Sequence, residues 1–513
     1  MRLALLPWIP APQPGVEDEF SYLLASDTFA SGQLTNPPHP LWVFFESIHI
    51  LQQPNYMSKY PPLTGLILAF GQKVFGHPWT GILLSMALLC GTVAWALRNW
   101  LPPFWAFLGT ALAVLKIGVL SYWSESYWGG TGAAIGGALL IGSLPALIRR
   151  PTWPRGLPAA IGIALLANSR PFEGFLLTLL CLGYAAWQII RRSTSPAVWL
   201  RNLSRGIAVP LIIVMVPVGS WMAYYNFRAT GSPDRMPWAV YEQQYAASPT
   251  LLWWTPPRTS VVYRHEAFRK LFLDWELKRK IVQREHFLLT RFLFLGNIEK
   301  FYLGILLLVV IVVCAPALVK SQRARPAFWL AVAFLFVLGT ELEPVPHYAA
   351  PATVLFYIVA AAALRSLRHW RTGRPWVAPA VYGIVLVVIT AQLSLALFQP
   401  EHRFLYDKRD FQAERTRILA FLRGMPGKQL VFVRYGPRHD VNHEWVYNRA
   451  DIDASTVVWA RSMGRDKDRT LISYFKNRRV WVLDENGPAR IAPYDAADHL
   501  DDKVSSAARS PGI

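Results

Sequence analysis

The sequence predicts an all-α polytopic membrane protein of about ten to eleven spans, followed by a small α/β domain outside the membrane. Two observations support this fold class. Of the 513 residues, 53% are hydrophobic and 16% are charged, whereas soluble proteins carry about 25% charged residues. The apolar residues are also concentrated in runs of about 20, the length at which a helix crosses a bilayer. After residue 400 the long apolar runs stop and the charge rises.

Eight apolar runs predict clear spans, at residues 79–97, 103–121, 131–148, 206–226, 299–319, 326–341, 347–366 and 376–398. A further apolar stretch, 157–190, is interrupted by polar residues 168–174, which predicts a hairpin of two short helices and brings the total to ten. The apolar segment that ends at Gly76 is short and contains Gln72 and Lys73, so we expect it at the membrane interface.

The first nine residues are apolar but too short to span, and they lack the pattern of a signal peptide. We expect them to be the last turns of a first span whose beginning is missing. The three cysteines, Cys90, Cys181 and Cys314, all lie inside apolar runs and show no disulfide or metal-binding spacing. We expect them to pack as small hydrophobic side chains.

The formal charge of +20 could indicate a nucleic-acid partner, but the basic residues sit in short loops between apolar runs. In a membrane protein this arrangement sets orientation. Five loops hold fifteen Lys and Arg residues and no Asp or Glu: Arg98; Arg149, Arg150 and Arg155; Arg191, Arg192, Arg201 and Arg205; Lys320, Arg323 and Arg325; and Arg365, Arg368, Arg371 and Arg374. We expect these loops to be cytoplasmic, in a multi-pass protein of the inner (plasma) membrane without a nucleic-acid partner.

The domain organisation follows from this topology. Residues 1–398 form the membrane domain, and its loops 10–78, 122–130 and 227–298 face outside. Residues 399–500 form the soluble external domain, with an amphipathic helix at 410–423 and strands at 429–434, 456–460 and 479–483. Residues 501–513 are predicted to be disordered.

An acidic cluster, Glu17-Asp18-Glu19, opens the first external loop, before a predicted helix over residues 20–31 that Gly32 ends. Acidic residues favour the first turn of a helix, so a solvated helix start is one explanation. Ionisable residues beside membrane spans are also candidates for function. Further polar residues are expected on the same side: Asn36, His39, Lys59, Glu125, Arg170, Glu173, Glu341, Glu343, His347 and Tyr348.

These residue types fit a transfer reaction at the membrane surface. A carboxylate can act as general base on an acceptor hydroxyl, and Lys or Arg can hold a phosphate leaving group. The external loops are rich in aromatic residues, which suit a sugar but also belt any membrane interface: Trp42, Tyr56, Tyr60, Tyr122, Trp123, Tyr127 and Trp128. No Gly-rich phosphate loop is present, so we expect no nucleotide; we expect no cofactor either, and the need for a divalent metal stays open.

Residues 15–365 resemble the GT-C glycosyltransferases that use polyprenyl-phosphate sugars, which include protein O-mannosyltransferases and the bacterial aminoarabinose transferase of lipid A. Asp18-Glu19 with Tyr22 looks like their Asp-Glu signature in the first external loop. Other segments resemble their later motifs, in the same order: Lys59 with Pro61-Pro62-Leu63, residues 71–76, Asn168-Ser169-Arg170-Pro171, and His347-Tyr348 with Pro351. The chain departs from the family pattern in four places: Tyr60 is inserted between Lys59 and Pro61, Glu125 replaces the usual Asp, Arg170 the usual Lys, and His347 the usual Arg.

The resemblance implies a GT-C-like membrane glycosyltransferase that moves a hexosyl or pentosyl group from a polyprenyl-phosphate donor to a lipid, glycan or protein acceptor. In family terms Asp18 is the base, supported by Glu19 and Glu125. Lys59 and Arg170 would hold the lipid phosphate. The remaining candidates for substrate binding are Tyr22, His39, His347 and Tyr348.

Two other functions stay open at this point. A transporter or flippase for a lipid-linked solute would also contain broken helices such as 157–190, although no second half repeats the break. A non-catalytic receptor or assembly factor would work through the C-terminal domain. The first alternative places charged residues near mid-membrane between related halves, whereas a transferase gathers Asp18, Lys59 and Arg170 in one external cavity.

Overall fold

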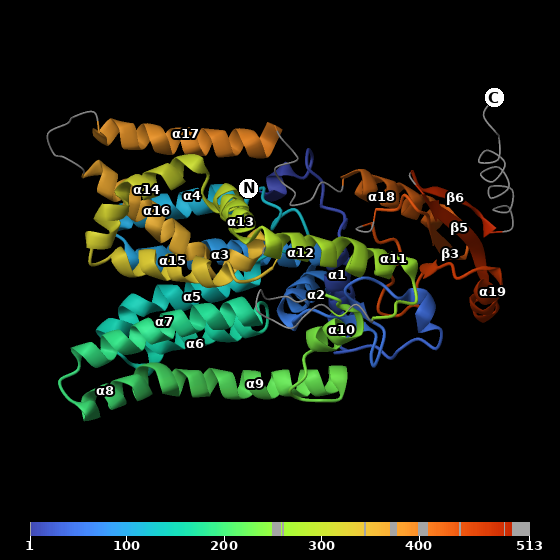
Figure 1. The fold of residues 1–513 in the computed structure, drawn as a ribbon, viewed down its shortest axis with the longest axis horizontal. Coiled ribbons are helices and arrows are strands. Elements are labelled where there is room, and N and C mark those ends of the chain that lie inside the picture. The colour runs from blue at the N-terminus through green and yellow to red at the C-terminus, as the bar shows by residue number, and fades with distance from the viewer. Residues whose placement is uncertain are drawn as a thin grey trace.

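The computed structural model describes residues 2–248, 258, 261–342, 345–369, 377–398, 409–440, 443–486 and 488–494. The molecule is elongated, with a bundle of apolar helices at one end and a small sheet domain at the other (Figure 1). Between them lie α1 (Glu17–Ala30), α2 (Pro62–Phe75) and α10 (Pro237–Tyr245). The two-part organisation predicted from composition is therefore confirmed.

Each of the ten predicted spans corresponds to a helix: α3 (Pro78–Trp100), α4 (Pro103–Ala113), α5 (Thr131–Arg149), α6 (Trp153–Ala167), α7 (Pro171–Arg192), α9 (Val209–Thr230), α14 (Ile305–Lys320), α15 (Arg325–Leu338), α16 (Thr353–Arg368) and α17 (Val377–Phe398). Five segments of the described chain are long and apolar enough to cross a membrane on their own: Pro78–Trp100, Thr131–Arg149, Pro171–Arg192, Pro196–Thr230 and Pro346–Arg368. The bundle is thus a multi-span membrane domain.

Two predicted boundaries are wrong. The hairpin over 157–190 contains one short helix, α6, but α7 has 22 residues and is a full-length span candidate. The predicted span 299–319 begins only at Ile305, because Gly304 adopts a φ of +82° and breaks the helix. The preceding helix, α13 (Phe287–Tyr302), is bent by 110° from α14 at this point.

The centre of the bundle is formed by α5 and α16, whose residues are mostly buried. Helix α5 is rich in Gly and Ala, which lets neighbouring backbones approach closely. A Cβ atom added at Gly137 would overlap the carbonyl oxygen of Pro351. This contact holds the 3₁₀ helix η6 (Pro346–Ala352), which carries His347 and Tyr348, against the bundle.

The segment before α3 folds around α1. This helix begins at Glu17 rather than at residue 20, because the Glu19 carboxylate accepts hydrogen bonds from the backbone N–H groups of Gly15 and Val16. After α1 come one 3₁₀ helix, η2 (Trp42–Phe45), and two short strands, β1 (Ile50–Leu51) and β2 (Met57–Ser58), which are followed by α2. The two strands pair antiparallel.

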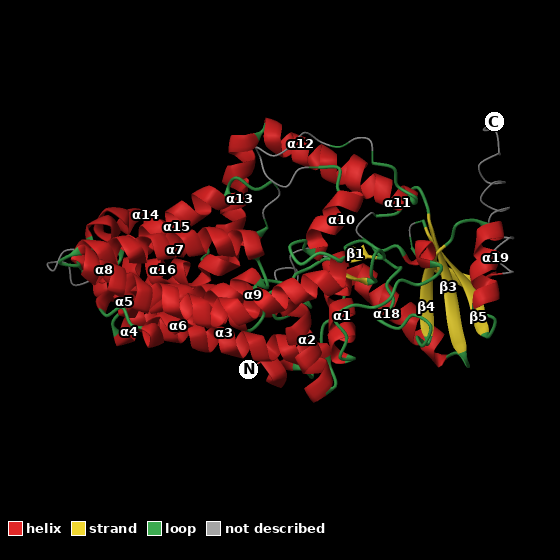
Figure 2. Cartoon of the chain, turned by 90° about the horizontal axis from the view of Figure 1, so that it is seen from below, coloured by secondary structure: helices red, strands yellow, loops and turns green. Residues whose placement is uncertain are grey.

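Short helices lie on both sides of α9 in the sequence. Before it come α8 (Pro196–Leu203) and the π-helix η4 (Ser204–Ala208). After α9 and α10 come α11 (Glu266–Arg269), the π-helical η5 (Lys270–Leu277) and α12 (Lys278–Glu285). Figure 2 shows α11 and α12 running along one side of the molecule, from the sheet domain towards the bundle.

The C-terminal domain contains the predicted helix and three strands, as α18 (Arg409–Gly424), β3 (Lys428–Tyr435), β4 (Val457–Arg461) and β5 (Arg478–Glu485). It adds α19 (Arg465–Tyr474) and β6 (Arg490–Pro493), which were not predicted. The sheet order is β4-β3-β5-β6, and only β6 runs antiparallel. The predicted disordered tail, 501–513, lies outside the described residues.

The C-terminal domain packs directly on α1. The Arg415 guanidinium lies 4.6 Å from the Phe20 ring, and Arg449 pairs with Asp27 at 2.9 Å. Arg461 also donates to the backbone oxygen of Glu46 at 2.6 Å. Helix α1, which carries the acidic cluster, is therefore held between α2 and the sheet domain.

Candidate active site

Asp18 lies in the first turn of α1 with its side chain about one-fifth exposed. The Tyr60 hydroxyl donates to its Oδ1, and His49 Nε2 lies 3.7 Å from the same oxygen. Among the described residues, no hydrogen bond reaches Oδ2. Burial raises the pKa of Asp18 to about 6, although the positive charges of Lys59 and Arg170 act in the opposite direction. Asp18 is thus a carboxylate with one oxygen available and a pKa suited to a general base near neutral pH.

Lys59 contributes a buried positive charge. Its side chain is 8% exposed, and its Nζ lies 4.5 Å from the Tyr241 ring centroid and 5.3 Å from that of Tyr60. No carboxylate within the described parts of the chain lies within salt-bridge distance of this ammonium group. Burial lowers the pKa of Lys59, while Glu242 and Asp18 act against that change. A buried cation that lacks a paired carboxylate is a ready site for an anionic ligand.

Arg170 caps the start of α7 at the hairpin tip. Its guanidinium lies 4.4 Å from the Tyr348 ring, and its Nη1 lies 3.5 Å from Glu173 Oε1. Its charge reaches Asp18, but it is partly neutralised by Glu173. Arg170 therefore offers a second cationic group, which is shared with Glu173 and supported by the Tyr348 ring of η6.

Backbone contacts bring these residues together. The backbone N–H of Leu63 donates to the carbonyl oxygen of Asn168 at 3.0 Å, which joins the start of α2 to the hairpin tip. The N–H of Lys59 donates to the oxygen of His49 at 3.2 Å, and the Ser21 hydroxyl donates to that oxygen at 2.6 Å. We call the resulting group of Asp18, His49, Lys59, Tyr60 and Arg170 the Asp18 cluster.

Two aromatic residues complete the surroundings of the Asp18 cluster. Tyr22 stacks on Tyr60 with ring centroids 4.5 Å apart. The Tyr241 hydroxyl accepts a hydrogen bond from the backbone N–H of His49 at 2.9 Å. Burial and the charge of Lys59 lower the pKa of His49 well below its usual value, so this imidazole is neutral.

The carboxylate of Glu19, the neighbour of Asp18, has a different set of hydrogen-bond partners. Besides its bonds to Gly15 and Val16, its Oε1 accepts from the backbone N–H of Tyr127 at 3.0 Å. Its side chain is buried, and burial raises its pKa to about 7 while the three amide donors act against this rise. All of its identified partners are backbone amides, so Glu19 ties the start of α1 to loop 122–130.

Glu125 is also engaged in packing. Arg2 donates to its Oε1 at 2.5 Å and to its Oε2 at 2.9 Å, and both side chains are buried. The Arg2 guanidinium lies 4.8 Å from the Trp79 ring. The structure therefore pairs Glu125 with the N-terminal segment rather than with a residue of the Asp18 cluster.

The remaining predicted residues divide between two places. His347 Nδ1 lies 3.1 Å from the Tyr122 hydroxyl and next to Tyr348, which supports Arg170. His39 instead lies 3.1 Å from Asp453 and packs edge-on against Phe45 and Tyr474. His39 thus belongs to the contact with the C-terminal domain, and Glu343 lies outside the described residues.

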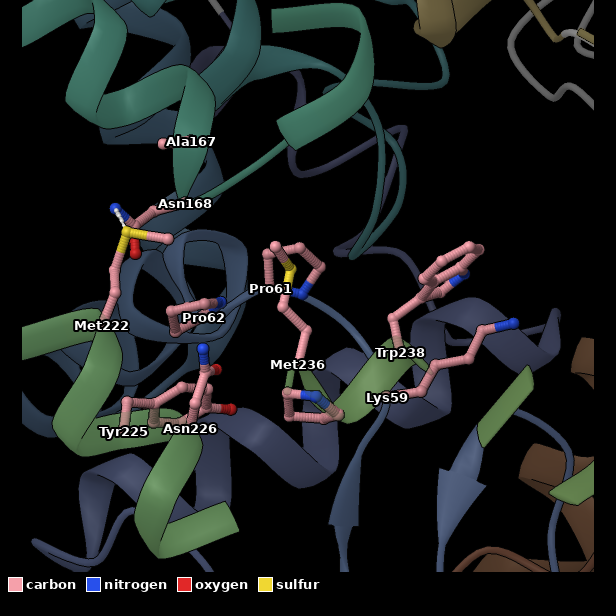
Figure 3. A pocket seen from close by; sticks show the side chains of 11 residues that line it. Lys59, Pro61, Pro62, Ala167, Asn168, Met222, Tyr225, Asn226, Met236 and Trp238 are labelled. Carbon is pink, nitrogen blue, oxygen red and sulfur yellow. Dashed lines mark hydrogen bonds between the residues drawn. The ribbon is translucent and has the colours of Figure 1, made fainter. Parts of the chain in front are cut away.

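A small pocket borders the Asp18 cluster. It holds about 330 Å³ of empty space, part of it open to solvent, and is lined by Lys59, Pro61, Pro62, Ala167, Asn168, Met222, Tyr225, Asn226, Met236, Pro237 and Trp238. In Figure 3 the Lys59 side chain extends away from Asn168 and Met222, beside Trp238. Asp18 and Arg170 are not among the lining residues, so this pocket is not the single shared cavity that the sequence predicted.

Sequence reasoning missed three members of the site. His49 and Tyr241 belong to no sequence motif that would have marked them as site residues. Tyr241 also lies 182 residues after Lys59, so its contact with Lys59 depends on the fold. Tyr60 was visible as the residue inserted between Lys59 and Pro61, but its bond to Asp18 was not predicted. Among the described residues, no group of three or more His, Cys, Asp or Glu could hold a metal ion.

No protein-family model matches the sequence, and no curated protein matches it either. Solved structures do. Apo ArnT from Cupriavidus metallidurans superposes with a TM-score of 0.54 at 13% identity, over 98% of this chain and 93% of that chain. The same protein bound to undecaprenyl phosphate gives a TM-score of 0.53 at 13% identity, over 96% and 91%. The oligosaccharyltransferase of Archaeoglobus fulgidus gives 0.44 at 11% identity, over 94% of this chain and 67% of that chain. The likeness to ArnT confirms the predicted GT-C-like fold, including a C-terminal sheet domain.

Proposed function

We propose that this protein is an integral membrane glycosyltransferase that moves a sugar from a polyprenyl-phosphate donor to an acceptor hydroxyl. The observation that carries the proposal is the Asp18 cluster. Within the described residues, it places a carboxylate with an available oxygen beside a buried ammonium group that has no carboxylate at salt-bridge distance. These two groups supply the base and the anion site that such a transfer needs. ArnT, which shares the fold, has a crystal structure in which it is bound to undecaprenyl phosphate.

The residues act in one displacement step. Asp18 takes the proton of the acceptor hydroxyl as that oxygen forms a bond to the anomeric carbon of the sugar. The bond between this carbon and the phosphate oxygen breaks, and the electron pair leaves with the polyprenyl phosphate. Lys59 and Arg170 hold the phosphate oxygens, where the negative charge develops. A single displacement inverts the configuration at the anomeric carbon.

The neutral His49 and Tyr60 orient the base. Tyr60 donates to one oxygen of Asp18, which leaves Oδ2 for the acceptor. Glu19 and Glu125 support the reaction indirectly, by fixing α1 and loop 122–130. Tyr22, His347 and Tyr348 are proposed to line the donor site. His39 is left out of this set because it contacts Asp453 of the C-terminal domain.

The location of the cluster favours transfer over transport. Its members come from helix starts and loops, at Asp18, Lys59 and Arg170, and not from the middle of spans. We propose that this end of the bundle and the C-terminal domain face the outside of the inner membrane, as the basic loops predict. The sugar is a hexose or a pentose, and the acceptor is a lipid, a glycan or a protein.

The function is tested first in cells. Lipids and surface glycans of a deletion strain are compared with those of its parent by mass spectrometry, to identify the sugar that is lost. We expect the wild-type gene to restore the modification and the Asp18→Asn gene to fail at equal protein levels. Identical glycans and lipids in the deletion strain and its parent would contradict the proposal.

A further inference from the structure

A second pocket lies beyond the Asp18 cluster. It holds about 680 Å³ of empty space, part of it open to solvent. Its walls come from two external loops that are distant in sequence: Trp42, Glu46, Gln53, Gln244, Tyr245, Val262, Tyr263, Arg264 and Phe268. The site described above uses none of these residues.

Helix α10 connects this pocket to the Asp18 cluster. Tyr241 contacts His49 and Lys59, and Tyr245, one helical turn later, lines the pocket. The two tyrosine rings lie 4.9 Å apart. Four residues of an α-helix span about 6 Å. The pocket therefore lies about one helical turn from a residue that contacts two members of the Asp18 cluster.

A buried carboxylate forms the base of the pocket. Glu46 is 2% exposed, accepts a hydrogen bond from the Tyr245 hydroxyl at 2.8 Å, and lies 3.2 Å from His265 Nε2. Burial acts to raise the pKa of Glu46, but the hydrogen bonds from His265 and Tyr245 prevail and hold it below the usual value. Glu46 Oε1 also lies 3.6 Å from Nη1 of Arg264, which lines the same pocket, so the two charges offset each other. This balance suits a neutral ligand with several hydrogen-bonding groups.

The rest of the lining is aromatic and amide-rich. Arg264 lies over the Trp42 ring at 4.8 Å with its side chain 56% exposed, and Tyr263 stacks on Phe272 at 5.6 Å. The Gln53 and Gln244 amides can both donate and accept hydrogen bonds, whereas a carboxylate accepts only. Hydroxyl groups meet both requirements, and the apolar face of a sugar ring suits the aromatic walls. A lipid tail would leave the polar groups unsatisfied.

We propose that this pocket is a carbohydrate-binding subsite that holds a sugar residue of the acceptor. That the sugar belongs to an acceptor rests on the proposed function, whereas binding of a neutral saccharide does not. The acceptor is then a glycan, or a glycolipid that presents one, and its reacting hydroxyl extends along α10 towards Asp18.

The test uses the full chain in phospholipid nanodiscs without any glycoside detergent, because a maltoside headgroup would compete for the pocket. Saturation-transfer NMR is recorded with methyl glycosides of glucose, mannose, galactose and N-acetylglucosamine, and with a Ser/Thr-rich peptide as an alternative ligand. We expect at least one glycoside to receive saturation. Its affinity should fall at least about fivefold in Trp42→Leu and in Arg264→Ala.

Matched controls come from a second Trp–Arg pair in the same part of the chain. Trp275 lies 5.0 Å from Arg279 outside the pocket, so Trp275→Leu and Arg279→Ala should bind as the wild type does. Asp18→Asn should also bind normally, which separates the subsite from the transfer reaction. Glycoside binding in a chain that shows no transfer activity would support the subsite while overturning the proposed function.

Three results would overturn the subsite. They are saturation of none of the glycosides, equal glycoside binding in the wild type and both pocket variants, or saturation of the peptide alone. Because Arg264 is more than half exposed, Arg264→Ala keeps the test decisive if Trp42→Leu does not fold.

Discussion

Asp18 and Glu19 are neighbours in sequence, yet their carboxylates have different kinds of hydrogen-bond partner. The Asp18 cluster consists of side chains, with one carboxylate oxygen left available and a buried cation nearby. Around Glu19, both oxygens accept from backbone amides, and the adjacent Glu125 is paired with Arg2. Backbone amides cannot move away for a substrate, so the comparison separates a carboxylate that holds the fold from one that is free to react.

The largest effect is expected at Asp18. Asp18→Asn preserves the shape of the side chain, and because burial disfavours the charged form of Asp18, removing the charge should not destabilise the fold. We expect the transfer rate of the purified protein, supplied with its polyprenyl-phosphate sugar, to fall about 10²–10⁴-fold. The melting temperature should not decrease. A near-wild-type rate would remove Asp18 as the base and move the assignment to Glu19.

The second-largest effect is expected on donor affinity, at Arg170. Arg170→Gln should weaken binding of the polyprenyl-phosphate donor by about tenfold or more, because a hydrogen bond to a charged group contributes about 1.5–3 kcal/mol. Donor affinity is measured by titration in nanodiscs. Arg228, which lies over Tyr224 at 6.0 Å, gives a matched control, and Arg228→Gln should bind as the wild type does. Unchanged affinity in Arg170→Gln would mean that this side chain only supports the fold.

The pH dependence should follow Asp18. Since its pKa is raised from 3.8 to about 6, the rate should fall about tenfold per pH unit below that value as the base becomes protonated. The same titration affects folding stability in the opposite direction, because stability decreases as the pH rises. The folded state binds this proton more tightly than the unfolded state, so the contribution to stability is full below about pH 4 and is lost as the pH rises through about 6.

Chemical denaturation across this pH range measures the contribution, and Asp18→Asn should abolish it. Glu19 titrates near 7 in the folded state, so the pH–rate profile of Glu19→Gln must be recorded as well. A rate that is flat between pH 5 and 7 would contradict the assignment of Asp18.

The smallest effect on the rate is expected at Glu19 itself. Glu19→Gln replaces one acceptor oxygen with an amide donor that faces backbone N–H groups, which should cost about 1–3 kcal/mol of unfolding free energy. The rate of the folded variant should change by only a few fold. Glu266, which pairs with Arg269 at 2.7 Å on the exposed surface of α11, serves as control, and Glu266→Gln should cost less than about 1 kcal/mol. A variant that stays stable but loses its rate would reverse the roles of the two carboxylates.

The sequence alone determined the helical membrane bundle, the ten apolar segments and the separate C-terminal domain. Hydrophobic runs and charge patterns report these features directly, because the bilayer imposes its thickness on each span. The helix and three strands of the C-terminal domain were likewise visible in local periodicity. The start of α1 was misplaced, because it depends on the bonds of Glu19 and not on a propensity.

Only the tertiary structure decided which polar residues share a site. Asp18, Lys59 and Arg170 meet because backbone bonds join the start of α2 to His49 and to Asn168. His39 and Glu125 are in comparable loops but turn towards Asp453 and Arg2. The sequence order of the motifs could place all five residues at one end of the bundle. It could not determine which carboxylate keeps an available oxygen, because that depends on partners up to 123 residues away, as for Arg2 and Glu125.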